Sequence, residues 1–220
     1  MDNTAIIETK NKRASLADGE IIYRNGLTEK IEYGITEIEE KTYSANDDIV
    51  CVVLPESVTK ICQHAFFHCT NLKSITLPDS VEEICFGAFS HCASMTSIKL
   101  PNGITKIPSF CFSPIPITEI TIPESVEEID SFAFFHCMEL KKIYLPKGIK
   151  IINNTAFLNC ILSDVYYNGS KDDWEQRHYE KLNDIFAGAK IYYNGTAEEK
   201  TKTAPQNGLF QSIKNLFGKK

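Results

Sequence analysis

The amino-acid sequence predicts a β-dominated α/β solenoid, in which about five to six coils stack along one axis and equivalent strands form a parallel sheet. Three observations support this fold class. The sequence repeats with a period of 23 residues, each copy contains a segment of alternating apolar residues, and a proline follows that segment. Because no single copy can bury both of its faces, the copies must stack to form a core.

Five copies align directly by their letters. They cover residues 54–76, 77–99, 100–121, 122–144 and 145–167, and the third copy is one residue shorter than the others. A degenerate copy precedes them, because Ile38 lies 23 residues before Ile61 and other apolar residues match at the same offset.

A short strand is predicted near the end of each copy. In the first copy Ile75 and Leu77 point inward and Thr76 points outward, which is the period of a strand. Pro78 has no backbone donor and therefore helps to end the strand.

The other half of each copy predicts a second extended piece followed by a tight turn. Val58 and Ile61 begin the extended piece, Ala65 lets the chain bend, and the ring of Phe66 fills the interior of the coil. The aromatic ring recurs at this position in every copy. We therefore expect one buried column formed by Phe66, Phe89, Phe112, Phe134 and Phe157.

The repeated pattern LPxxVxxIxxxAFxxCxxLxxIx resembles the BspA-like leucine-rich repeat, over about residues 31–167. The resemblance implies a leucine-rich-repeat solenoid that serves as a protein-interaction or adhesion module, with no shared catalytic site. Residues 165–195 are similar to the segment that often closes such arrays, with a short helix around 172–179 and a final strand at 190–193. The third copy departs from the pattern at Cys111 and at Ser113–Pro116, which predicts a local kink or bulge.

These segments define the expected organisation of the chain. We expect an N-terminal leader and cap at 1–30, the solenoid at 31–167, a C-terminal cap at 168–195, a linker at 196–206 and an amphipathic helix at 207–220.

Composition and charge narrow the classes of function. The formal net charge of −6 gives no general attraction to phosphate backbones, so we expect no nucleic-acid partner. The N-terminus carries no secretion signal, and no run of about 18 apolar residues occurs. We therefore expect a cytoplasmic protein, with the cell surface as the alternative location. In a reducing compartment its eight cysteines are expected to be free thiols.

Cysteines and histidines recur at fixed positions of the copies. Cys62, His64, His68 and Cys69 lie within eight residues, and zinc accepts these ligand types. A ladder of packed thiols explains the same pattern, because four cysteines share one register: Cys69, Cys92, Cys137 and Cys160. We expect no metal and no cofactor, and the absence of nucleophile and phosphate-loop motifs predicts no enzyme.

The strand positions after each turn carry charges of alternating sign. The outward residues of successive copies are Thr59 and Lys60, Glu82 and Glu83, Thr105 and Lys106, Glu127 and Glu128, and then Lys150, which predicts a self-neutralising surface ladder.

The outward residues of the other strand form the candidate contact surface for a protein partner. This surface is small, polar and weakly basic, and its tyrosines are residues that anchor interfaces. The candidate binding residues are Lys73, Thr76, Lys99, Thr121, Lys141, Lys142, Tyr144 and Tyr166.

The tail beyond the repeats predicts a helix with one apolar stripe, formed by Leu209, Phe210, Ile213, Leu216 and Phe217. Such a short helix is not stable alone in water, so its apolar face needs a surface. The solenoid itself, a partner's groove or peripheral contact with an anionic membrane would each provide one. Because the linker is long, we expect a separable attachment element whose deletion leaves the melting temperature almost unchanged.

The leading functional hypothesis is a non-enzymatic protein-binding or scaffolding module that uses the parallel-sheet face, with a protein partner that the sequence does not name. A surface adhesin exported by an unrecognised route is one alternative. A metal-binding protein or metalloenzyme built on the Cys/His positions is the other.

Overall fold

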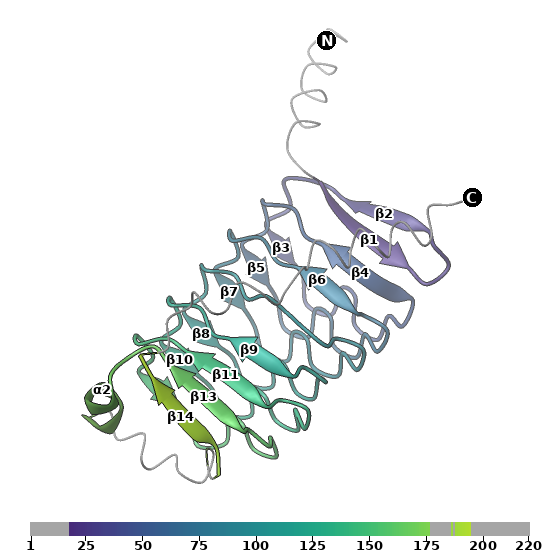
Figure 1. Cartoon of the computed structure of the whole chain (residues 1–220). Helices are drawn as coiled ribbons and strands as arrows, with labels where there is room; N and C mark the ends of the chain where they lie inside the picture. The colour runs from purple at the N-terminus through teal and green to yellow at the C-terminus, as the bar shows by residue number, and fades with distance from the viewer. Residues whose placement is uncertain (1–17, 177–185, 187, 195–220) are drawn as a thin grey trace, which may run out of the picture.

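The computed structural model of the chain describes residues 18–176, 186 and 188–194. The chain winds into a solenoid of about six coils, which stack from β1 and β2 at one end to β14 and α2 at the other (Figure 1). Each coil has a long-strand side, a short-strand side and a turn side. The predicted parallel-sheet solenoid with 23-residue coils is confirmed.

Six strands of the long-strand side pair in parallel with a neighbouring strand. At the N-terminal end, β1 pairs antiparallel with both β2 and β4. The long-strand side contains β1 (Gly19–Tyr23), β2 (Thr28–Ile31), β4 (Ile49–Val53), β6 (Ser74–Thr76), β9 (Glu119–Thr121), β11 (Lys142–Leu145), β13 (Asp164–Tyr167) and β14 (Lys190–Tyr193). The short-strand side contains β3 (Glu37–Ile38), β5 (Lys60–Ile61), β7 (Glu83–Ile84), β8 (Lys106–Ile107), β10 (Glu128–Ile129) and β12 (Ile151–Ile152).

Backbone hydrogen bonds join the coils on all three sides. On the short-strand side the N–H groups donate to the preceding coil, as Cys62 N does to Ile38 O at 2.9 Å. On the long-strand side they donate in both directions, as Lys73 N does to Val50 O at 2.8 Å and Leu54 N to Thr76 O at 3.1 Å. On the turn side they donate to the following coil, as Phe66 N does to Ala88 O at 2.9 Å. The turns therefore contribute to the stack as the strands do, and their backbone polar groups are paired.

The predicted phenylalanine column is confirmed and runs through the centre of the stack. The rings of Phe66, Phe89, Phe112, Phe134 and Phe157 are all buried. Neighbouring ring centroids lie 5.0 to 5.7 Å apart, with planes within 20° of parallel. Tyr43 precedes the column at 5.2 Å and Phe186 follows it at 6.1 Å, so one aromatic column links the first coils to the last.

Both strand ladders are interrupted near the boundary between the second and third copies, which is not the site of the kink or bulge predicted at Cys111 and Ser113–Pro116. The short strands divide between β7 and β8, and the long strands divide between β6 and β9. Residues 97–99 were expected to form a strand, but they belong to neither of the two sheets on the long-strand side. The expectation of one continuous parallel sheet is therefore wrong at these residues. One cause is Pro108, which has no N–H at the position where Cys85 and Asp130 donate to the preceding coil.

Two positions on the turn side adopt the left-handed backbone conformation in almost every coil. The first is occupied by Lys41, His64, Gly87, Phe110 and Phe132, and the second by Ala45, His68, His91, His136 and Asn159. Their φ angles lie between 56° and 64°. Histidine and asparagine are enriched in this conformation among non-glycine residues, so backbone geometry explains why histidines recur here.

Replacing Ala45 with glycine is expected to stabilise the protein by about 0.5–1 kcal/mol, because Ala45 is exposed and has a φ of 57°. The strain removed exceeds the entropy that glycine adds to the unfolded chain. Ala93 provides the matched control, since it is exposed but does not have a positive φ. Ala93→Gly should lower stability by about 0.4–1 kcal/mol. Urea unfolding of both variants checks this, and equal shifts would contradict the assignment of strain to Ala45.

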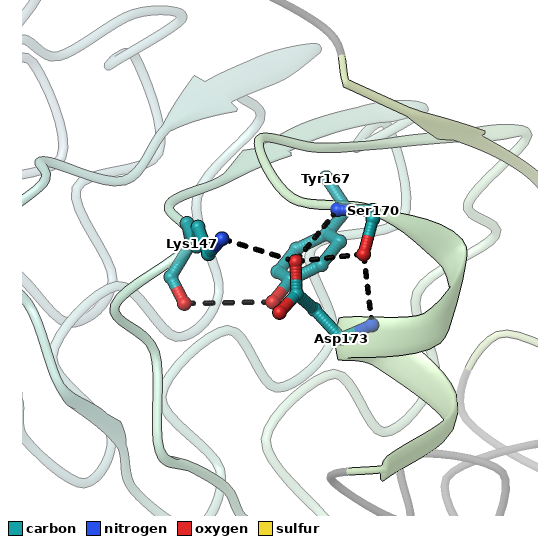
Figure 2. Close-up of polar contacts among 4 residues, drawn as sticks. All are labelled: Lys147, Tyr167, Ser170 and Asp173. Atoms are coloured by element: carbon teal, nitrogen blue, oxygen red, sulfur yellow. Dashed lines mark hydrogen bonds and ion pairs between the residues drawn. The ribbon is translucent and has the colours of Figure 1, made fainter.

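The helix α2 (Lys171–Gln176) begins at a reciprocal cap after β13. The Ser170 hydroxyl accepts a hydrogen bond from the Asp173 N–H at 3.0 Å, and Asp173 Oδ2 accepts one from the Ser170 N–H at 3.0 Å. Lys147 Nζ lies 3.2 Å from the same carboxylate, and its backbone carbonyl accepts a hydrogen bond from Tyr167 (Figure 2). The hydrogen bonds from Ser170, with Lys147 nearby, lower the pKa of Asp173 to about 2.

The cap places Trp174 over the end of the core. Its ring is buried and lies 5.1 Å from Tyr167, 5.8 Å from Phe186 and 6.4 Å from Tyr193, measured between centroids. The apolar end of the last coil is thus covered by an aromatic group. The final strand at 190–193 lies where the sequence predicts it, and the helix starts at 171.

Candidate protein-binding surface

Two rows of side chains cross the outward face of β9, β11, β13 and β14. The strand register aligns the members of each row with one another. The charged row consists of Glu119, Lys142, Asp164 and Lys190. The tyrosine row consists of Thr121, Tyr144, Tyr166 and Tyr192.

The three tyrosine rings stack face to face along the solenoid axis. Centroids of Tyr144 and Tyr166 are 4.7 Å apart, and those of Tyr166 and Tyr192 are also 4.7 Å apart, with planes 17° and 7° from parallel. This spacing equals the distance between adjacent strands, about 4.8 Å, so the sheet itself dictates the stack. Each ring is half-buried, and each supports the conformation of its neighbour. The row therefore presents a rigid amphipathic edge.

The charged row alternates in sign from strand to strand. Hydrogen bonds from Ser163 and Tyr192, together with the ammonium groups of Lys142 and Lys190, lower the pKa of Asp164. The Nζ of Lys190 also lies 4.6 Å from the centroid of the Tyr192 ring. Asp164 is therefore ionised at neutral pH, and the two rows are connected through Tyr192.

All eight predicted binding residues lie on the long-strand side, five of them near the two rows and three of them apart from the rows. Five gather around the two rows: Thr121, Lys141, Lys142, Tyr144 and Tyr166. Lys73 and Thr76 lie at β6, beyond the interruption, and Lys99 lies in the segment outside both sheets. Tyr192 and Lys190 were not among the predicted binding residues. Tyr192 follows Tyr166 by 26 residues instead of 22 or 23, because α2 lies between their strands.

The cysteines lie in the stack as hydrogen-bonded thiols. Cys69, Cys92, Cys137 and Cys160 donate to the carbonyl oxygens of Tyr43, Phe66, Phe112 and Phe134, at 3.0 to 3.2 Å. Burial raises the pKa of Cys69 to about 11 and holds that of Cys92 well above its ordinary value. All eight cysteines are free, and protonated thiols are poor nucleophiles and poor metal ligands.

Within the described part of the chain, no three side chains of His, Cys, Asp or Glu gather to hold a metal ion. His68, His91 and His136 lie exposed on the turn side, at left-handed positions. The tail residues Leu209, Phe210, Ile213, Leu216 and Phe217 fall outside the described residues, as do 196–206 and the predicted helix at 207–220. None of the described helices is long and apolar enough to cross a membrane.

The short-strand side carries the predicted charge ladder. Lys60 Nζ lies 2.9 Å from Glu83, Lys106 Nζ lies 3.2 Å from Glu128, and Lys150 pairs with Glu127 at 2.7 Å. Lys106 also lies 3.1 Å from Asp130. These pairs confirm the predicted neutralisation, and because they are exposed each contributes little to stability.

The turn side carries a second aromatic surface that sequence reasoning missed. Half-buried and exposed rings contact one another along this side, with centroids 5.0 to 6.3 Å apart; they are Phe86, Phe110, Phe132 and Phe135. Phe110 and Phe132 occupy equivalent positions of successive copies, whereas Phe86 and Phe135 lie at two other positions of the repeat, so the repeat alignment contained only part of the signal. This surface is the alternative to the tyrosine row as a contact site for a partner.

Comparisons with known proteins place this geometry among repeat proteins. A family model described as the BspA type leucine rich repeat region matches residues 36–163 in six copies. A leucine rich repeat protein of T. pallidum is 26% identical, with a TM-score of 0.52, over 76% of this chain and 84% of that one. A leucine rich cell surface protein of Faecalibacterium prausnitzii A2-165 is 31% identical, with a TM-score of 0.53, over 71% of this chain and 39% of that one.

The pneumococcal vaccine antigen PcpA has a TM-score of 0.60 and covers 88% of this chain and 45% of its own length. At 16% identity this likeness shows the fold alone. No curated protein matches the chain. The chain thus spans most of the T. pallidum protein, but less than half of the F. prausnitzii and pneumococcal ones.

Proposed function

The chain belongs to the BspA-type leucine-rich repeat family, and we propose that it is a non-enzymatic protein-binding or scaffolding module. Proteins of this repeat family are typically protein-interaction or surface-protein modules. The contact surface is the part of the long-strand side formed by the tyrosine row and the charged row. The observation that carries this proposal is the stack of Tyr144, Tyr166 and Tyr192 on the outward face of three adjacent strands.

Rigid tyrosine rings lower the entropic cost of binding a partner. A tyrosine ring supplies a large contact area and a polar hydroxyl, and it has few rotatable bonds to immobilise. Stacking at 4.7 Å holds these rings in place before a partner arrives, which reduces the ordering cost of association. The alternating charges beside them give register and orientation to a partner with the opposite alternation.

A chain with Tyr144, Tyr166 and Tyr192 all replaced by serine tests this proposal. The full-length protein is immobilised and used to capture partners from a lysate of its native cell. We expect the serine variant to lose captured proteins that the wild type retains, and the affinity of an identified partner to fall at least tenfold.

The matched control replaces three lysines of the short-strand side with serine, the half-buried Lys60 and the exposed Lys106 and Lys150. Circular dichroism verifies that both variants fold. Equal capture by the tyrosine variant and the wild type would contradict the proposal, and loss of capture in the control alone would move the contact surface to the short-strand side.

A second candidate function is adhesion at a cell surface. The observation that favours it is the likeness to the F. prausnitzii cell surface protein, at 31% identity over 71% of this chain. Adhesion would use the same tyrosine row, with a partner outside the cell. Labelling of intact native cells with an antibody against the solenoid distinguishes this role from an internal one.

A further inference from the structure

The row that is charged at one end of the long-strand side is small and apolar at the other end. Ile22, Cys51 and Ser74 lie opposite one another across β1, β4 and β6. They point outward, because their neighbours Ile21, Val52 and Ile75 belong to the core. The Cys51 thiol and the Ser74 hydroxyl lie 3.2 Å apart and satisfy each other, so little polarity is offered outward.

A β-bulge adds a further apolar side chain to this part of the face. The register shifts between Ile22 and Tyr23, which leaves Val50 without an opposite residue. Ile22, Val50 and Cys51 then form a cluster separate from the core of the solenoid. We call these three residues the outer apolar cluster.

The outer apolar cluster is buried although it faces away from the core. The exposed fractions are 1% for Ile22, 5% for Val50 and 0% for Cys51. At the other end of the long-strand side, Lys142 and Lys190 of the charged row are exposed. In the described chain β1 contacts β2 and β4, β4 contacts β6, and no other described strand or helix packs across these strands (Figure 1).

We propose that the tail segment 207–220 docks on the outer apolar cluster and covers it. The sequence supplies an apolar stripe of matching character, with Leu209, Phe210, Ile213, Leu216 and Phe217 at helical spacing. A short amphipathic helix and an apolar outward face are each stabilised by burial against another apolar surface, and here each supplies that surface to the other.

The chain between the solenoid and the tail is long enough for this contact. From β14 to β4 the sheet order gives six strand spacings of about 4.8 Å, or about 29 Å, with Ser97–Lys99 counted as one level. Fourteen residues separate Asn194 from Leu209, and they span up to about 46 Å when extended. The contact therefore accounts for the length of the linker that the sequence predicts at 196–206.

A docked tail is part of the fold, and not the separable attachment element that the length of the linker predicts. The docked segment covers the N-terminal part of the long-strand side and leaves the tyrosine row accessible. The inference does not depend on the proposed function, because it concerns a contact within the chain.

Cys51 provides a direct readout of the contact. The full chain, a chain lacking 196–220 and the variant Leu216→Asp/Phe217→Asp are labelled with N-ethylmaleimide under native conditions, and each cysteine is followed by peptide mass spectrometry. We expect Cys51 to react at least tenfold faster in the deleted chain and in the double variant. Asn215→Asp, opposite the apolar stripe at helical spacing, is the control and should match the wild type.

Cys92, which is buried in the core, reports whether each variant remains folded, and the point variant keeps the test valid if the deletion loosens the stack. Equal Cys51 rates in the full chain and the double variant, with Cys92 protected in both, would overturn the proposal. So would protection of Cys51 that disappears on dilution, because the cover would then be a second copy of the chain.

Discussion

Replacing Phe89 with alanine is expected to lower the free energy of unfolding by about 3–5 kcal/mol. The ring is fully buried and lies between two others, 5.5 Å from Phe66 and 5.7 Å from Phe112. Removing it leaves a cavity inside the stack and breaks two ring contacts. The loss falls beside the interrupted strand ladders, where the aromatic column and the turn-side backbone hydrogen bonds join the coils.

Phe86 provides the matched control, because it is a phenylalanine of the same coil that is 41% exposed. Phe86→Ala should cost less than about 1 kcal/mol, as expected for a surface substitution with partial burial. Chemical denaturation of both variants gives the comparison. Similar losses in the two variants would show that the column does not dominate the stability of this region.

Replacing Trp174 with alanine is expected to cost about 3–5 kcal/mol and to act mainly at one end of the solenoid. The indole covers the aromatic residues of the last coils, and solenoids require a closing element at each end. Each coil contacts mainly its neighbours, so the damage spreads inward from the uncovered end. Hydrogen exchange should accelerate first in β13 and β14.

Glu175→Ala, an exposed change on the same helix, should leave the exchange of these strands unaltered. A uniform rise in exchange across all coils of the Trp174 variant would contradict local closure, because it would mean that the solenoid unfolds as one cooperative unit.

The repeat made the core of this protein predictable. When identical positions stack at the strand spacing, one copy determines the environment of all the others, so the phenylalanine column, the thiol ladder and the alternating charges followed from alignment alone. Tyr144 and Tyr166 were found in the same way, as outward residues of adjacent strands.

Features that depend on departures from the repeat were harder to predict. Tyr192 was not predicted because α2 lies between its strand and the previous one, which changes the sequence separation between Tyr192 and Tyr166. The interrupted ladders depend in part on a single missing donor at Pro108, which the repeat pattern does not reveal. The recurring histidines suggested metal ligands, whereas the left-handed backbone accounts for their positions. The outer apolar cluster required a bulge at Val50 to bring its members together.

Hydroxyl-radical footprinting of the chain, alone and bound to a captured partner, shows whether the partner contacts the tyrosine row or the turn side. We expect oxidation of Tyr144, Tyr166 and Tyr192 to fall in the complex, while Phe86 and Phe110 on the turn side react as they do in the free chain. Protection of these phenylalanines with unchanged oxidation of the three tyrosines would contradict this expectation, and would place the contact surface on the turn side of the solenoid.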